Sequence, residues 1–291
     1  EDSFLREHYG VNSTGWGTPF LLCPEATNVD ETTLKKLAEA TENELYTSDV
    51  SPLGVPFNNI RHNPSDDEKD RKIDAGKPGS ACPRGHLVSN VEFTKEPICT
   101  ASRLYQKLKL DQLTKLQLAF VDYKKQFDVI VKKACLCNDL GEGALINSNV
   151  AKNGKRFSAV CPGPNLAYFS KIVTLKEMVD HIYGRINLLN PGYRPNMFDK
   201  ELKINIDFMV REIKKMLPSP TPKQILYLNE FRTNLLEGIE YYQKLFPQMA
   251  LESEEYRQKA LEELDALKAR LEEFVTVYNK VFNPQPQFIP A

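Results

Sequence analysis

The sequence of 291 residues lacks a net charge, a long apolar run and the common motifs that identify a function. Its 38 basic and 39 acidic residues give a formal net charge of −1, so no long-range field attracts nucleic acid or an anionic membrane. No apolar stretch approaches the roughly 20 residues of a membrane span. We therefore expect a cytoplasmic protein that binds neither nucleic acid nor a membrane.

Signals of nucleotide binding, of triad catalysis and of secretion are missing as well. The sequence contains no Walker loop, no GxGxxG motif and no legible Ser/His/Asp arrangement. The first ten residues, EDSFLREHYG, show neither an initiator methionine nor the basic start and apolar centre of a signal peptide. We expect a processed product or a part of a longer protein.

Cysteine is the residue type whose distribution is most informative. Five of the six cysteines lie between positions 81 and 162, where prolines and glycines make regular structure scarce. A chain of this length without a secretory signal is not expected to use them in disulfides. The six are Cys23, Cys82, Cys99, Cys135, Cys137 and Cys161.

Thiolates in irregular loops suit a metal centre, because such backbone can turn several sulfurs inward. We predict four ligands, Cys82, Cys99, Cys135 and Cys137, with Cys161 as a substitute. Their spacing matches no standard ferredoxin or zinc-ribbon pattern, and paired CxxC knuckles are absent, which favours an iron–sulfur cluster over zinc. The alternative is that these cysteines pack as small apolar residues, which is our expectation for Cys23.

Two histidines and the single tryptophan allow two interpretations each. His86, near Cys82, is either a further ligand or a loop residue bonded to backbone. His181 is expected on the surface or at an interface. Trp16, between two glycines, either stacks on a flat ligand or lies half-buried at a rim.

The N-terminal third suggests alternating elements followed by irregular chain. Residues 3–9 predict a helix ended by Gly10, PFLLC (19–23) predicts a buried strand, and Asn28 with Glu31 predicts a capping box for the next helix. From 47 to 170 we expect mainly loops, with an extended piece at GVPF (54–57). That region also predicts a helix capped by Thr100, an amphipathic helix with Phe120, Tyr123, Phe127 and Ile130 on one face and the cysteine pair at its end, and short strands or loops at 141–146 and 156–165.

After residue 170 the pattern is helical throughout. Thr174 with Glu177, and Thr221 with Pro222 and Gln224, predict two well-capped helix starts. Another helix is predicted at 198–217. Apolar residues at three- and four-residue steps mark the last helix, and we expect these helices to pack antiparallel. The stripe is Leu261, Leu264, Leu267, Leu271 and Val275.

The stretch WGTPFLLCPEATNVDETTLKKL (16–37) resembles the last barrel strand of the FMN-dependent nitronate monooxygenase (2-nitropropane dioxygenase) and enoyl-reductase-like family. SDVSPLGVPFNN (48–59) is similar to the segment that follows the barrel. The resemblance implies a (β/α)8 barrel in which Gly17 and Thr18 offer backbone amides and a hydroxyl to the FMN phosphate. The family's glycine-rich first strand and its catalytic histidine have no counterpart in this sequence.

These observations predict a mixed, mostly α fold in three parts. Residues 1–60 would be the C-terminal end of an FMN-binding barrel, 61–170 a cysteine-rich segment with a metal or iron–sulfur site, and 171–291 an α-helical domain. The implied function is the C-terminal part of an FMN-dependent oxidoreductase that acts on a small molecule and joins the remaining barrel or a partner subunit. The alternative is a non-catalytic, metal-stabilised or plain helical interaction module.

Overall fold

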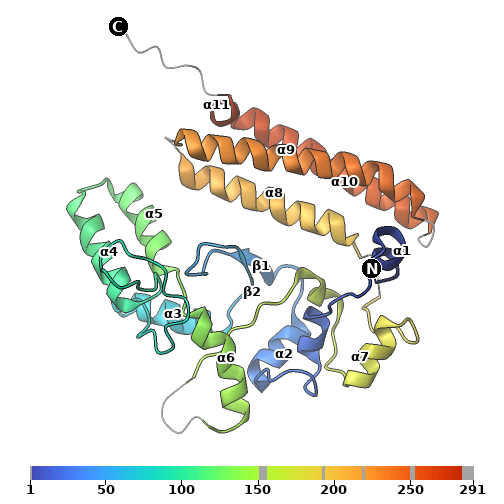
Figure 1. Ribbon diagram of the computed structural model, residues 1–291, viewed down its shortest axis with the longest axis horizontal. Coiled ribbons are helices and arrows are strands. Elements are labelled where there is room, and N and C mark those ends of the chain that lie inside the picture. The colour runs from blue at the N-terminus through green and yellow to red at the C-terminus, as the bar shows by residue number, and fades with distance from the viewer. Residues whose placement is uncertain (1, 151–155, 192–193, 218–219, 250–252, 284–291) are drawn as a thin grey trace. The chain divides into compact units, whose positions relative to one another are not determined.

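The computed structural model describes residues 2–150, 156–191, 194–217, 220–249 and 253–283, and the fold is mostly helical (Figure 1). The chain forms two compact units, Glu1–Pro191 and Gly192–Ala291. No helix among the described residues combines the length and the apolar character needed to cross a membrane.

The first unit contains seven α-helices and one two-stranded sheet among its described residues. The helices are α1 (Asp2–Tyr9), α2 (Glu31–Glu39), α3 (Pro64–Asp74), α4 (Arg103–Lys115), α5 (Phe120–Val131), α6 (Leu136–Asn147) and α7 (Leu175–Ile182). Strands β1 (Leu45–Ser48) and β2 (Phe57–Ile60) pair antiparallel, with Leu45 opposite Ile60. The predicted extended piece at GVPF therefore corresponds to the start of β2, displaced toward its C-terminal side.

The predicted buried strand PFLLC is wrong, because Thr18–Leu22 forms a 3-10 helix, η1. Pro19 fixes φ in the helical range at the first turn, and the Phe20 amide donates to the Gly17 carbonyl at 3.1 Å. Leu22 and Cys23 are nevertheless fully buried, as an apolar run requires. The described residues thus contain no strand at the position that suggested a barrel.

Helix α2 begins two residues later than the sequence suggests. Its N-cap is Asp30, whose carboxylate accepts from the Thr33 amide at 3.1 Å, so the capping box predicted from Asn28 and Glu31 is wrong. In the same way α4 is capped by Ser102 and not by Thr100. In both cases the sequence offers several good capping residues within three positions, and tertiary contacts select among them.

One hydrophobic core crosses the boundaries that the sequence suggested at 60 and 170. It joins residues of η1, α2 and β2 to residues 160–178, including the second 3-10 helix, η2 (Pro164–Tyr168), and α7. Segments 1–60 and 61–170 therefore share one unit, and the division lies after Pro191. The fully buried members of this core are Leu22, Cys23, Leu37, Leu166 and Met178.

The second unit is built on three long helices, α8 (Met197–Met216), α9 (Pro222–Leu245) and α10 (Glu254–Val277), with the short α11 (Asn279–Phe282) and the 3-10 turn η3 (Phe246–Gln248). The capping box at Thr221 and Gln224 is confirmed, as is the one at Thr174 and Glu177 in the first unit. Buried apolar side chains on the helices form the core, among them Ile206, Met209, Ile213, Leu228, Ile239, Leu264 and Leu271.

Candidate metal centre

Three segments of the first unit bring the predicted cysteine ligands toward one another. The loop before Cys82 is tied to the segment after Cys99, because the Ser80 amide donates to the Ala101 carbonyl at 2.9 Å and the Arg103 amide donates to the Ser80 carbonyl at 2.7 Å. Gly79 makes this approach feasible. A β-carbon at Gly79 would lie 2.7 Å from the Arg103 α-carbon, and the φ of +86° there also favours glycine.

Cys82 itself adopts a left-handed backbone conformation, with φ of +55°. A cysteine rarely adopts this conformation, so the surrounding structure must hold it. The Cys82 amide donates to the Ser80 hydroxyl at 3.2 Å, which closes the turn.

Cys135 and Cys137 stand at the start of α6 and not, as the sequence suggested, at the end of the preceding helix. Cys135 occupies the N-cap position, and its carbonyl accepts from the amides of Asn138 and Asp139 at 3.0 Å each. The Ala134 amide donates to the Val50 carbonyl at 2.9 Å and fixes the chain just before the pair. Cys99 and Cys135 are buried, and Cys82 and Cys137 are half-buried.

The four thiols act on one another electrostatically. Burial raises the pKa of Cys99, the Ala101 backbone opposes this effect, and Cys82 and Cys137 add to it. Burial raises the pKa of Cys135 to about 11, with Ser80 opposing this effect and Asp139, Cys137 and Cys82 adding to it. The four cysteines chosen from the sequence thus lie in one neighbourhood, and none of them forms a disulfide among the described residues.

The four thiols do not form a closed metal site among the described residues. As the described residues stand, no group of three or more His, Cys, Asp or Glu side chains is arranged to hold a metal ion. A mononuclear zinc site would need four donors drawn to about 2.3 Å from one point. Four thiolates can hold either an iron–sulfur cluster or a single zinc ion, so the residue types do not select between the two.

The remaining candidate residues lie outside this group. His86 is exposed, and Cys161 is exposed and interacts with the Asn58 backbone. His181 packs edge-on against Phe169 at 5.4 Å between ring centroids and accepts from the Leu188 amide at 3.3 Å. Trp16 is half-buried and donates to the Thr14 hydroxyl at 3.1 Å. Packing as the role of Cys23 is confirmed by its complete burial in the core.

Gly17 and Thr18 line a cavity of about 500 Å³ near Cys161, α6 and the loop before α2. The Thr18 hydroxyl already accepts from the Gly163 amide at 3.0 Å. The only charged side chain on this lining is Asp30, which is acidic. A phosphate dianion would therefore meet no basic side chain and one carboxylate, so this cavity does not fit the FMN phosphate.

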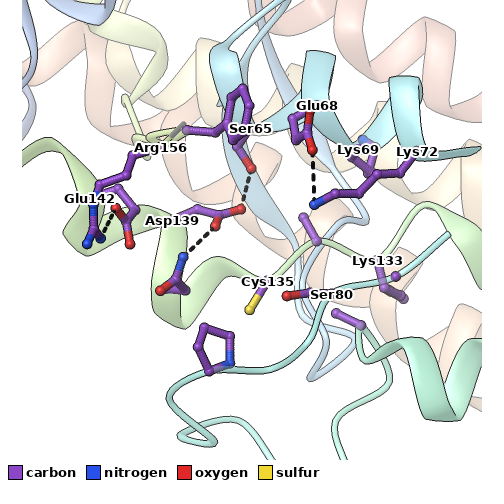
Figure 2. Close-up of a pocket in the computed structure, with 16 residues that line it drawn as sticks. Ser65, Glu68, Lys69, Lys72, Ser80, Lys133, Cys135, Asp139, Glu142 and Arg156 are labelled. Atoms are coloured by element: carbon purple, nitrogen blue, oxygen red, sulfur yellow. Dashed lines mark hydrogen bonds and ion pairs between the residues drawn. The ribbon is translucent and has the colours of Figure 1, made fainter. Parts of the chain in front are cut away.

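A second cavity, of about 400 Å³, opens beside Cys135 between α3, the loop at 79–83 and α6 (Figure 2). Ser65 donates to the Asp139 carboxylate at 2.5 Å, and Asn138 donates to its other oxygen at 3.2 Å. Burial raises the pKa of Asp139, and these hydrogen bonds oppose that effect. Glu142 is buried and pairs with Arg156 at 2.6 Å.

Sequence reasoning missed this cavity. Ser65 and Asp139 are 74 positions apart, and no motif links them. The sequence did contain a local signal for the start of α3, because asparagine followed by proline, as in Asn63 and Pro64, is typical of a helix start. The structure shows this start, since the Asn63 carboxamide accepts from the Asp66 amide at 3.0 Å. That start orients Ser65, Glu68, Lys69 and Lys72 toward the cavity.

Comparisons with known proteins found no relative of this chain. No family model matches it, and there is no significant match among the curated proteins or the solved structures.

Proposed function

We propose that this chain is the iron–sulfur-binding part of an oxidoreductase, with Cys82, Cys99, Cys135 and Cys137 as the cluster ligands. The observation that supports the proposal is the gathering of these four thiols from three separate segments. The four cysteines lie close together and form no disulfide among the described residues. A metal centre that all four bind would explain this arrangement.

The surrounding chain has features that suit such a centre. Burial keeps the thiols of Cys99 and Cys135 neutral when no metal is bound, so a metal would displace their protons and bind them as thiolates. Ser80 lies in the same lining as Cys135, opposes the effect of burial on the pKa of that thiol, and can tune a bound sulfur. A bound cluster supplies one-electron transfer, and the protein would set its potential through this burial and hydrogen bonding.

The flavin part of the proposal comes from the sequence resemblance alone. In an FMN-dependent oxidoreductase of the nitronate monooxygenase or enoyl reductase type, the cluster would pass electrons to or from the flavin. Because the cavity at Gly17 and Thr18 does not fit a phosphate, we propose that FMN binds to a barrel portion or a partner subunit outside this chain. The reducing environment of the cytoplasm would keep the thiols available.

The proposal is tested by purifying the chain anaerobically and measuring visible absorbance and iron, with about four iron atoms per chain expected. Serine substitutions at Cys82, Cys99, Cys135 and Cys137 should each lower the iron content and change the spectrum. Cys23→Ser and Cys161→Ser are the matched controls and should retain iron. Iron that is lost equally from the control variants would contradict the ligand assignment.

The alternative function, a non-catalytic helical module stabilised by metal or by packing alone, predicts a different result. A chain that binds zinc and loses stability when zinc is removed would support a metal-stabilised module. A colourless protein free of both iron and zinc would contradict any metal centre. Addition of FMN to the chain, followed by gel filtration, should leave it flavin-free, since FMN is proposed to bind elsewhere.

A further inference from the structure

The cavity beside Cys135 has the composition of a binding site for a small anion. Four basic side chains line it, Lys69, Lys72, Lys133 and Arg156, and three acidic ones, Glu68, Asp139 and Glu142. Basic side chains thus outnumber acidic ones on the lining, but Lys69 pairs with Asp66 outside it at 2.8 Å. With Lys69 engaged by Asp66, the remaining basic side chains, opposed by three carboxylates, suit a monoanion such as a carboxylate better than a phosphate dianion.

One buried donor in this lining has no protein partner. The Nη1 atom of Arg156 pairs with Glu142, whereas its Nε atom is buried and without a hydrogen-bond partner in the part of the chain that the structure describes. Buried polar atoms are nearly always satisfied, so this guanidinium N–H is available to donate to a water or to a bound acceptor. A carboxylate is the acceptor that matches the planar edge of a guanidinium.

The other groups of the cavity would complete the contact. Lys72 pairs with Glu68 at 3.3 Å, and Glu68 also pairs with Arg71, so Lys72 can engage an anion without leaving Glu68 unpaired. Lys72 also acts electrostatically on Asp139 across the cavity. Figure 2 shows Lys72, Asp139, Cys135 and Ser80 around the same open space, with Ser65 above it.

We propose that this cavity binds a small monocarboxylate, with Arg156 and Lys72 holding the carboxylate and Ser65, Ser80 and Asp139 contacting polar substituents. Its volume of about 400 Å³ lies within the usual range for small-molecule sites. The bound molecule would lie beside Cys135, one of the proposed cluster ligands. The inference does not rest on the iron–sulfur proposal, because the charge pattern and the unpaired donor are independent of any metal.

The test is calorimetric titration of the full chain with acetate, lactate and succinate, with neutral lactamide and with inorganic phosphate. Lactate should bind, and lactamide should not. Lys72→Met and Arg156→Gln should each weaken lactate binding about tenfold or more, as expected for the loss of a charge-assisted hydrogen bond. Lys77→Met removes an exposed lysine just beyond the same helix and should leave binding unchanged.

Each contrary outcome is decisive. Absence of binding by acetate and lactate, equal binding of lactamide, or wild-type affinity in Lys72→Met would overturn the proposal, and tighter binding of succinate or phosphate would overturn the monocarboxylate assignment. If Arg156→Gln fails to fold because Glu142 is left unpaired, Lys72→Met alone decides. Iron is measured on the same samples, so an iron-free protein that binds lactate would contradict only the cluster.

Discussion

The α-carbon of Gly143 in α6 faces the carbonyl oxygen of Asn28 so closely that a β-carbon on it would lie 2.7 Å from that oxygen. Helix α6 therefore packs directly on the backbone of the loop that precedes α2. The Asn147 side chain reinforces this contact, since it donates to the Val29 carbonyl at 2.9 Å. This approach fixes the helix that carries Cys137, Asp139 and Glu142.

We expect Gly143→Ala to destabilise the protein by about 1–3 kcal/mol, because backbone atoms must move to relieve the contact. Gly238→Ala in α9 is the control, because no atom lies within 4 Å of a β-carbon built there. That control should be neutral or stabilising by up to about 1 kcal/mol, since alanine favours helix. Chemical denaturation of both variants measures the two effects, and a Gly143→Ala variant as stable as wild type would contradict the packing.

Asn63→Ala should cost about 2–4 kcal/mol, because it removes a helix cap and leaves a buried carboxylate with fewer donors. The Asn63 side chain accepts from the Asp66 amide and donates to the Asp66 carboxylate at 2.8 Å and to the Ile60 carbonyl at 2.8 Å. Asn43 is exposed and its side chain makes no such contacts, so Asn43→Ala should change the denaturation midpoint little. Equal effects of the two substitutions would count against the network.

Asp199 should make the second unit less stable as the pH rises from about 4 to 7. Its side chain is 2% exposed, both carboxylate oxygens lack partners among the described residues, and burial together with Glu263 raises its pKa to about 7. Between the unfolded pKa near 3.8 and the folded value, the native state binds more protons than the unfolded state, so stability falls with pH. The loss should approach about 4 kcal/mol at pH 8, from roughly three pKa units.

Asp199→Asn removes this ionisation and should flatten the difference between pH 5 and pH 8 in denaturation curves. Asp265→Asn is the control, because Asp265 is exposed and accepts from Gln243 at 2.7 Å. A pH dependence that is unchanged in Asp199→Asn would show that Asp199 is not the group that titrates.

Leu264→Ala should destabilise the three-helix core by about 3–5 kcal/mol, because Leu264 is completely buried and its truncation leaves a cavity. Leu226→Ala is the matched control, since Leu226 is 59% exposed on α9 and should cost well under 1 kcal/mol. Thermal unfolding followed by circular dichroism separates the two. Comparable losses would contradict the assignment of Leu264 to the core.

The sequence predicted a helix start correctly where a single pair of neighbouring residues makes all the capping hydrogen bonds. Thr174 and Thr221 each close a reciprocal pair of hydrogen bonds with the residue three positions later, and no distant contact competes. At α2 and α4 more than one capping residue lies within three positions of the helix start. The Asp30 carboxylate that caps α2 also accepts a hydrogen bond from Ser158, 128 positions away, and this contact favours Asp30 as the cap. Such a selection cannot be inferred from sequence alone.

The metal site stays a prediction, although the structure places the four cysteines chosen for it near one another. Chemistry alone singled out Cys82, Cys99, Cys135 and Cys137, because loop cysteines have few structural uses. Helix α6 was misjudged because Gly141 and Gly143 resemble helix breakers, whereas Gly143 is required by a tertiary contact. Likewise PFLLC is apolar enough for a strand or a buried helix, and only its packing decides between them.

Helices α4 and α5 form a hairpin whose two ends lie beside the four cysteines. Ser80 pairs with the chain just before α4, and Val50 holds Ala134 just after α5. Phe120, the first residue of α5 after the turn that joins the two helices, is 80% exposed. The hairpin is therefore anchored at its base by the segments that present the thiols, and its far turn can accept a fluorescent label or an inserted peptide while the thiol cluster keeps its geometry.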